Sequence, residues 1–305
     1  MKFDTSANKA FLTHSFLLGL MRIKGKSVTE VKTLLEASLV LGINYFDHAD
    51  IYGAGECETL FAQAMKELNV PREKYYLQSK VGIRPGVAYD FTYDHIINSV
   101  DGILKRLATP YLDVLLLHRL DLLMEPEVVA KALITLQKSG KVRHFGVSNM
   151  HQSTISLLEK HLPFKLIINQ LQLSVSYNAL ITSNIYVNSD YPFEGYGTYG
   201  LLNYMMENDI KVQAWSPLMH HHWQSLLDHP ELPALNELLE KLAIKYGVTK
   251  SAVAIAFILR DPAKMQVVLG TTNPKHLKEA AEATTFKLTH DEWYALMQAS
   301  GQKVI

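Results

Sequence analysis

Residues 27–68 read SVTEVKTLLEASLVLGINYFDHADIYGAGECETLFAQAMKEL, and this stretch decides the fold class. The pattern Ser27-x-x-Glu30 is a capping box, which marks the start of a helix. An amphipathic segment follows it, then a short apolar run typical of a buried strand, then a Gly-containing loop and a second helical pattern. The stretch predicts three consecutive elements, namely a helix over 28–40, a strand over 43–47 and a helix from about 56 to 68.

The strand and helix unit recurs along the rest of the chain. With the segment before Gly19 as the first strand, the pattern gives eight strands that alternate with helices. Such alternation indicates a parallel sheet, and eight nearly continuous apolar strands favour a closed (β/α)8 TIM barrel over a doubly wound sheet, the weaker alternative. Further strands are expected over 76–80, 113–118, 142–147, 166–170, 211–215 and 266–269, and helices over 93–107, 127–139, 153–161, 201–208 and 235–246, with another after Asn273 and Pro274.

Four segments lie outside this rhythm. A β-hairpin is expected over 11–23, ahead of the barrel, and extra helices are expected over 250–260, capped by Thr249, and over 290–300. Residues 174–200 are rich in Tyr, Asn, Ser and Gly. Irregular stretches of this length in compact domains are usually functional, so we expect a lid or pocket wall there.

Composition narrows the class of function. The 305 residues include 30 basic and 30 acidic ones, so no charge imbalance points to nucleic acid or to an anionic membrane. Cys57 is the only cysteine, which suits a reducing compartment, and residues 16–21 form too short an apolar run for a signal or membrane segment. We expect one cytoplasmic domain over 1–305 that acts on a small molecule, with its oligomeric state left open.

Four polar residues end, or closely follow, neighbouring apolar strands. Asp47 ends one strand and Tyr52 lies in the loop beyond it, while Lys80 and His118 end the next two strands. Enzymes with this barrel place reactive groups at the C-terminal ends of strands, so we expect these side chains to converge.

The chemistry of such a cluster is specific. A carbonyl that receives a hydride also needs a proton, and a tyrosine with its ordinary pKa near 10 is a poor acid at neutral pH. A lysine cation beside Tyr52 favours the phenolate and is expected to lower that pKa. Asp47 would keep Lys80 charged, and His118 would orient the carbonyl oxygen.

Several further segments resemble those of one enzyme family. Asp47–Gly53 (DHADIYG), Gly146–Asn149 (GVSN), Ile168–Gln170 (INQ) and Ala214–Leu218 (AWSPL) resemble the signature segments of the aldo-keto reductases, in the family's order. The resemblance runs from about Leu18 to Glu282. Within the family the chain resembles the bacterial YdhF-like oxidoreductases, through Asp47–Gly53 and Gly140–Gly146 (GKVRHFG).

The resemblance implies NAD(P)H-dependent reduction of an aldehyde or ketone, with Asp47, Tyr52, Lys80 and His118 as the catalytic tetrad and Tyr52 as proton donor. NADPH is the expected cofactor and NADH the alternative, because Gly270, Thr271 and His276 replace the Lys-Ser pair and the arginine that hold the 2′-phosphate in many relatives. The implied cofactor contacts are Gly19, Leu20, Met21 and Arg22 near the ribose; Ser148, Asn149, Gln170 and Trp215 at the nicotinamide; Ser216 and Leu218 at the pyrophosphate; and Gly270, Thr271, Thr272, Asn273, His276 and Glu279 at the adenosine end.

Two rival functions stay open at this point. A strand-end lysine can form a Schiff base, so Lys80 could serve an aldolase. An intact tetrad also occurs in cofactor-binding interaction subunits, such as the reductase-like subunits of some potassium channels. The run His220, His221 and His222 is not expected to bind metal, because consecutive side chains diverge and no second pair stands at ligand spacing.

Overall fold

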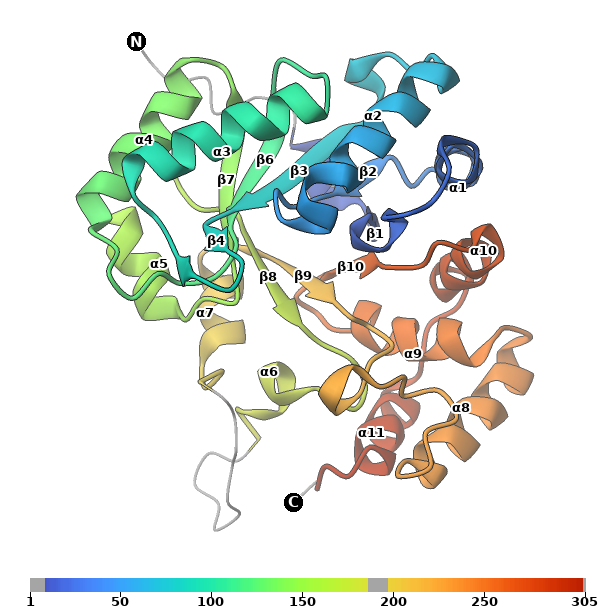
Figure 1. The fold of residues 1–305 in the computed structure, drawn as a ribbon. Helices are drawn as coiled ribbons and strands as arrows, with labels where there is room; N and C mark the ends of the chain where they lie inside the picture. The colour runs from blue at the N-terminus through green and yellow to red at the C-terminus, as the bar shows by residue number, and fades with distance from the viewer. Residues whose placement is uncertain (1–8, 186–196, 304–305) are drawn as a thin grey trace. The chain divides into compact units, whose positions relative to one another are not determined.

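The computed structural model of this chain describes residues 9–185 and 197–303. Eight strands close into a barrel in the order β1, β10, β9, β8, β7, β6, β3, β2, which confirms the predicted (β/α)8 fold (Figure 1). The strands are β1 (Phe16–Gly19), β2 (Tyr45–Asp47), β3 (Tyr76–Val81), β6 (Leu112–Leu117), β7 (Val142–Ser148), β8 (Ile168–Gln172), β9 (Lys211–Trp215) and β10 (Gln266–Leu269).

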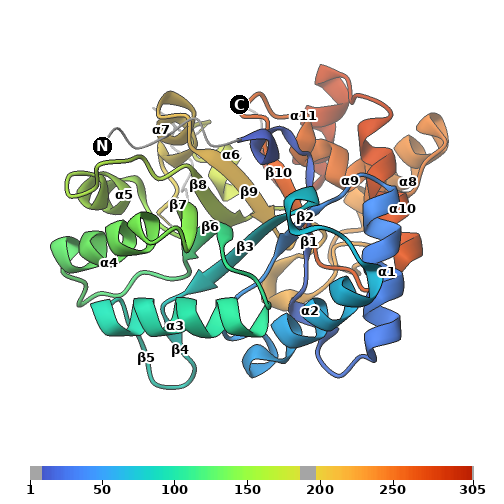
Figure 2. The ribbon, with the colours of Figure 1, turned by 90° about the horizontal axis from the view of Figure 1, so that it is seen from above.

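Backbone contacts divide the chain into two compact units, residues 1–169 with 270–274, and residues 170–269 with 275–305. The expectation of one domain over 1–305 therefore stays a prediction. In the first unit, β2, β3, β6 and β7 pair in parallel, and helices run along their outer side (Figures 1 and 2). These helices are α1 (Val28–Val40), α2 (Glu56–Leu68), α3 (Tyr93–Arg106), α4 (Pro126–Lys138) and α5 (Gln152–Glu159).

The local sequence signals account for these helices. Ser27 and Glu30 form the expected capping box at α1, and the predicted bounds of α1 and α2 agree with the structure. All six residues of β6 are buried, as a strand covered on both faces requires. The site-bearing part of the fold thus follows from capping and apolar periodicity.

The second unit carries β9 and a group of helices, α6 (Ala179–Thr182), α7 (Leu201–Glu207), α8 (Pro233–Tyr246), α9 (Lys250–Leu259) and α11 (His290–Ala299). The two extra helices predicted near its end are confirmed as α9, capped by the Thr249 side chain, and α11, with its capping box. The helix α10 (Pro274–Ala281) starts at the boundary between the units. Across the described residues, no helix on its own has the length and apolar character needed to cross a membrane; α8 and α9 meet that criterion only jointly, across a bend of 93°.

The predicted N-terminal hairpin over 11–23 is wrong. This segment contains a 3-10 helix, η1 (Ala10–Thr13), then β1, then a second 3-10 helix, η2 (Met21–Ile23). Residue 11 is apolar because the Phe11 ring packs against Tyr45 and Tyr76, and not because it belongs to a strand. A small antiparallel pair does occur elsewhere, between β4 (Ile83–Arg84) and β5 (Ala88–Tyr89).

Only part of the predicted lid over 174–200 can be compared with the structure. It contains the single-turn helix α6, and its residues 186–196 lie outside the described part of the chain. Its role as a lid therefore stays a prediction.

Candidate active site

Neighbouring strands of the first unit bring the four predicted catalytic residues together. Asp47 is the last residue of β2, and it is paired in register with Gln78 of β3. Lys80 lies near the end of β3, and His118 directly follows β6, where its backbone N–H donates to Val81 O at 2.9 Å. Tyr52 begins a 3-10 turn, η3 (Tyr52–Gly55), that joins β2 to α2.

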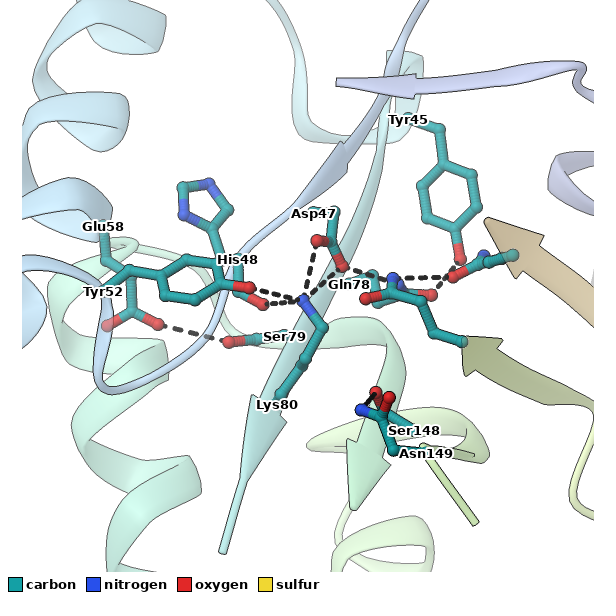
Figure 3. Close-up of polar contacts among 12 residues, drawn as sticks. Tyr45, Asp47, His48, Tyr52, Glu58, Gln78, Ser79, Lys80, Ser148 and Asn149 are labelled. Atoms are coloured by element: carbon teal, nitrogen blue, oxygen red, sulfur yellow. Dashed lines mark hydrogen bonds and ion pairs between the residues drawn. The ribbon is translucent and has the colours of Figure 1, made fainter. Parts of the chain in front are cut away.

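A continuous chain of hydrogen bonds links three of these side chains, those of Asp47, Lys80 and Tyr52 (Figure 3). The Lys80 ammonium donates to both oxygens of Asp47, at 2.8 and 2.7 Å, to His48 O at 2.9 Å and to the Tyr52 hydroxyl at 3.1 Å. Gln78 Nε2 donates to Asp47 Oδ1 at 2.7 Å, and the Tyr45 hydroxyl donates to Gln78 Oε1 at 2.7 Å. The chain thus runs from Tyr45 through Gln78, Asp47 and Lys80 to Tyr52.

The ion pair at its centre is fully buried. Lys80 is 0% exposed and Asp47 is 2% exposed. Burial by itself lowers the pKa of Lys80, but the Asp47 carboxylate and Tyr52 outweigh it, so the net pKa of Lys80 is raised. Lys80 therefore stays an ammonium ion at neutral pH.

The expected lowering of the pKa of Tyr52 by Lys80 is only one of two opposing effects. Burial raises the pKa of Tyr52, the Lys80 cation opposes that rise, and the net pKa lies above its ordinary value. The expectation of a net lowering is therefore corrected. Tyr52 stays a protonated phenol, and its oxygen accepts the Lys80 hydrogen bond.

His118 lies edge-on to Tyr52, with ring centroids 6.1 Å apart and an interplanar angle of 81°. Burial, then the charges of Lys80 and Arg119, hold the pKa of His118 well below its usual range. The imidazole is therefore neutral and carries one N–H. Its Nδ1 is buried and has no hydrogen-bond partner within the described residues, so the ring keeps a polar atom to offer.

Sequence reasoning missed a second charged network beside this chain. Glu58 of α2 is fully buried, accepts from Arg106 Nε at 2.5 Å and from Ser79 Oγ at 3.3 Å, and so fixes the residue next to Lys80. Burial raises the pKa of Glu58 to about 7 despite Arg106, and burial raises the pKa of Asp50 to about 6. The Arg106 guanidinium thus bonds Glu58, and its charge also acts on Asp50.

The sequence feature that could have indicated this network is a pair of glycines, Gly55 and Gly102, which leave space for the Arg106 side chain. A Cβ at Gly55 would lie 2.6 Å from Arg106 Cδ, and a Cβ at Gly102 would lie 2.9 Å from Arg106 Nη1. Gly55 also has φ of 92°, in the left-handed region. Sequence alone offered Gly55 only as a turn glycine, because the side chain that needs the space comes from α3.

Several predicted cofactor residues lie in the first unit. Arg22 Nη1 donates to Gly270 O at 2.9 Å, and a Cβ at residue 270 would lie 2.5 Å from the same nitrogen. Gly19 and Leu20 are buried at the end of β1, whereas Met21 and Arg22 are exposed. Asn149 Nδ2 donates to Ser148 Oγ at 2.7 Å after β7 (Figure 3). Thr271 Oγ1 accepts from Asn273 N at 3.1 Å, and Thr272 is half-buried between them.

The remaining predicted cofactor residues lie in the second unit. Gln170 Nε2 donates to Gln213 Oε1 at 3.0 Å. The Trp215 ring stacks on Trp223, with centroids 5.5 Å apart and an angle of 24°. Ser216 and Leu218, both half-buried, accept backbone bonds from Met219 and Leu226. His276 is exposed, and Glu279 forms a loose ion pair with Lys275 at 3.8 Å.

Comparison with known proteins shows the family to which the chain belongs. The model of the aldo/keto reductase family matches residues 16–300. The chain is 33% identical to the oxidoreductase YdhF of Escherichia coli K12, over 93% of each chain. It is 34% identical to a 6-dehydroglucose reductase of Agrobacterium fabrum, over 88% of this chain and 87% of the relative. A solved aldo-keto reductase of Klebsiella pneumoniae in complex with NADPH has a TM-score of 0.73 at 22% identity, over 93% and 90% of the two chains. This chain therefore belongs to the aldo/keto reductase family of oxidoreductases.

Proposed function

We propose that this protein uses NADPH to reduce an aldehyde or ketone to an alcohol, with Tyr52 as the proton donor. The observation that supports this most directly is the bond from the Lys80 ammonium to the Tyr52 hydroxyl, at 3.1 Å, with Lys80 held by Asp47 at 2.7 Å. One chain of hydrogen bonds thus contains an acid, a cation to stabilise its conjugate base and an anion to hold that cation.

The direction of the hydrogen bonds supports proton donation by Tyr52. Because the phenol oxygen accepts a bond from Lys80, its own O–H points elsewhere and can donate to a carbonyl oxygen. The raised pKa keeps that proton on Tyr52 until negative charge develops on the substrate. Once the proton leaves, the phenolate remains beside an ammonium ion, which stabilises it.

His118 suits a second role at the same carbonyl oxygen. Its lowered pKa makes it a neutral donor, so it can orient the carbonyl without taking the proton from Tyr52. When bound, NADPH supplies a hydride to the carbonyl carbon. Residues of this chain then have three tasks, namely to orient the carbonyl, to deliver one proton and to stabilise the charge left on Tyr52.

We propose that the residues at Gly270 bind the 2′-phosphate, the one group that distinguishes NADPH from NADH. Gly270 leaves the space that the Arg22 guanidinium occupies, and Arg22 is anchored there by its bond to Gly270 O. A guanidinium has five N–H donors and suits phosphate oxygens. Arg22 can therefore supply a positive charge at Gly270, where many relatives have the Lys-Ser pair that holds the 2′-phosphate. Thr271 and Thr272 follow it with hydroxyl groups. Ser148, Asn149, Gln170 and Trp215 would hold the nicotinamide.

The substrate class is a small carbonyl compound. One relative at 34% identity is named as a 6-dehydroglucose reductase, so we include 6-dehydroglucose with simple aldehydes, ketones and quinones in the substrate panel. The location we propose, given the family and the single buried cysteine, is the cytoplasm.

Two rival functions make different predictions. A Schiff-base aldolase needs a neutral lysine as nucleophile, whereas Asp47 raises the pKa of Lys80. An interaction subunit would bind NADPH and show no oxidation of it with any member of the carbonyl panel. Borohydride trapping of substrate on Lys80 would favour the aldolase.

The proposed acid is tested by Tyr52→Phe, which removes only the hydroxyl. We expect the variant to retain NADPH binding, which is measured by quenching of tryptophan fluorescence. Its kcat should fall by about 10²- to 10⁴-fold, the usual contribution of a general acid. Tyr75→Phe is the matched control, since Tyr75 is buried just before β3 and lies outside the bond chain. A Tyr52→Phe enzyme with wild-type kcat would exclude Tyr52 as the donor.

The cofactor is tested by titrating the wild-type protein and Arg22→Ala with NADPH and with NADH. If Arg22 contacts the 2′-phosphate, the variant should lose about tenfold in NADPH affinity, which is the loss of about 1.4 kcal/mol, and should bind NADH as before. An equal loss for both cofactors would indicate a pyrophosphate contact instead. Unchanged affinity for both would show that Arg22 binds neither phosphate.

A further inference from the structure

Two imidazoles and a carboxylate that have no assigned part in the reaction converge in the segment after β9. His220, His229 and Glu231 each offer one ligand atom, and these atoms all lie within 4.8 Å of one another. The rings of His220 and His229 meet edge-on, with centroids 5.0 Å apart. We propose that these three side chains form a binding site for a divalent transition-metal ion such as Zn²⁺.

The set of donors selects the class of metal. Two imidazole nitrogens and one carboxylate suit Zn²⁺, Co²⁺, Ni²⁺ or Cu²⁺, whereas Mg²⁺ and Ca²⁺ prefer oxygen ligands alone. Zn²⁺ binds nitrogen and carboxylate oxygen at about 2.0–2.2 Å, so ligand atoms in a tetrahedral site lie roughly 3.3 Å apart. Reaching that spacing shortens each separation between ligand atoms by at most about 1.5 Å, and one of the three side chains, Glu231, is exposed.

A neighbouring glutamine orients one of the imidazoles for this role. His229 Nε2 lies 2.7 Å from Gln224 Oε1, and since an amide oxygen can only accept, Nε2 carries the proton. His229 Nδ1 then has a lone pair, which in the structure accepts a longer bond of 3.2 Å from Glu231 N. Histidine ligands characteristically bind metal through one nitrogen and donate from the other to an oxygen. Gln224 gives His229 that arrangement, with Nδ1 as the ligand atom.

The backbone of this segment is fixed on both sides of the cluster. His220 N donates to Gln224 O at 2.7 Å, which closes the turn that holds the first ligand. Asn236 of α8 donates to Leu226 O at 2.9 Å and accepts from Asp228 N at 2.6 Å. The ligands are thus presented by a preorganised loop.

From the histidine run the sequence predicted no metal site, because consecutive side chains diverge and no second pair stands at the ligand spacing of known short motifs. Of the run, the cluster uses His220, and the other two ligands come from residues 229 and 231. A tight turn and the cap of α8 bring them back to His220, which spacing rules for short motifs do not capture.

The same loop carries Trp223, whose ring stacks on Trp215. The proposed ligands come before and after Trp223 in the sequence, so a metal ion that joins them would restrain this loop. Zn²⁺ binding should therefore raise the midpoint of thermal unfolding and change tryptophan emission, both of which can be measured without substrate or cofactor.

The proposal is tested by titrating the full-length chain, freed of metal by a chelator and carrying no histidine tag, with ZnCl₂ in a calorimeter. We expect one Zn²⁺ per chain, and at least about tenfold weaker binding for His220→Ala, His229→Ala and Glu231→Gln. Co²⁺ should give the visible absorption bands of a tetrahedral site, and Gln224→Ala should weaken binding of both metals.

His290→Ala is the matched control, because His290 is an exposed histidine 3.7 Å from the Asp291 carboxylate and lies outside the cluster. The control should bind Zn²⁺ as wild type does. Glu231→Gln keeps the test decisive if a histidine variant unfolds, since Glu231 is exposed and its amide analogue should fold normally. The proposal is overturned if the wild type binds no Zn²⁺, if Glu231→Gln binds it as tightly as wild type, or if His290→Ala loses as much affinity as His229→Ala.

Discussion

Two buried charge networks lie side by side in the first unit, and they differ in how their charges are matched. Around Lys80, one cation faces one carboxylate, and the ammonium also bonds a carbonyl and a phenol. Around Arg106, one cation bonds the Glu58 carboxyl at 2.5 Å and acts on the Asp50 carboxyl only through its charge. The first network has balanced charge and the second has an excess of acid.

The pKa shifts follow from that difference. Burial opposes any charge, and a partner of opposite sign has to offset it. Asp47 does so for Lys80, whose pKa is raised and which stays charged. Arg106 cannot do so for two carboxyls, so burial raises the pKa of Glu58 to about 7 and that of Asp50 to about 6. Proximity to a cation alone therefore does not fix a charge state.

The largest effect should come from breaking the balanced network with Lys80→Met, which keeps the length of the side chain. Asp47 is then left buried without its cation, and removal of one partner of a buried pair usually costs about 3–5 kcal/mol of stability. We also expect a loss in kcat of about 10²- to 10⁴-fold, because the Tyr52 phenolate loses its stabilising ammonium. Urea unfolding and steady-state kinetics measure the two effects.

Lys245→Met serves as the control, since Lys245 forms an ion pair with Glu292 but is 55% exposed. Exposed pairs contribute about 0–1 kcal/mol, so this variant should unfold and turn over nearly as wild type does. If Lys80→Met were as stable as Lys245→Met, the Asp47–Lys80 pair would not be a matched buried pair.

A smaller effect should appear in the unbalanced network as a dependence of stability on pH. The folded-state pKa of Glu58 is about 7, above its ordinary value of 4.5, so the folded state holds a proton that the unfolded chain has released. Stability therefore falls as pH rises from about 4.5 to about 7, and Asp50 adds a similar fall below pH 6 or so. A change of one in pKa corresponds to about 1.4 kcal/mol, which limits the Glu58 contribution to roughly 3 kcal/mol.

Glu58→Gln cannot ionise, so its unfolding free energy should change less between about pH 5 and pH 8 than that of the wild type. Glu30→Gln is the control, because hydrogen bonds from Ser27 lower the pKa of Glu30 to about 2. Its contribution is lost only in acid and leaves this window unchanged. Equal slopes for Glu58→Gln and wild type, measured by urea unfolding at several pH values, would show that Glu58 does not take up a proton there.

The two networks were not equally predictable from the sequence. Asp47, Tyr52, Lys80 and His118 were found because each ends or follows an apolar strand, and parallel pairing brings strand ends to one edge. Glu58 and Arg106 lie on helices, where charged residues are ordinarily solvated, and the space for Arg106 depends on Gly55 and Gly102. Contacts between helices distant in sequence leave no periodic signal.

The fold shows the same limit. Helices with strong caps were predicted closely: the bounds of α1 agree with the structure, and those of α11 differ by one residue at its end. Residues 11–23, in contrast, were wrongly expected to form a hairpin. The hairpin was predicted because apolar residues lie on both sides of a polar turn. One of them, Phe11, is apolar for another reason, since its ring packs on Tyr45 of the barrel. An apolar residue in the sequence indicates a buried side chain, but it does not indicate which side chains bury it.

The smallest effect on kcat should come from Tyr45, at the end of the hydrogen-bond chain farthest from Tyr52. Tyr45→Phe removes the hydroxyl that donates to Gln78 Oε1 at 2.7 Å, and both residues are fully buried. The lost bond should cost about 1 to 2 kcal/mol of stability. Because Lys80 still holds Asp47 through two oxygens, kcat should change less than about threefold, on the order of 0.6 kcal/mol in barrier. Tyr75→Phe is again the control, because it removes a phenol hydroxyl that lies outside the bond chain. A kcat for Tyr45→Phe as low as that of Lys80→Met would mean that Gln78, and not Lys80, sets the position of Asp47, so that the catalytic chain would extend to Tyr45.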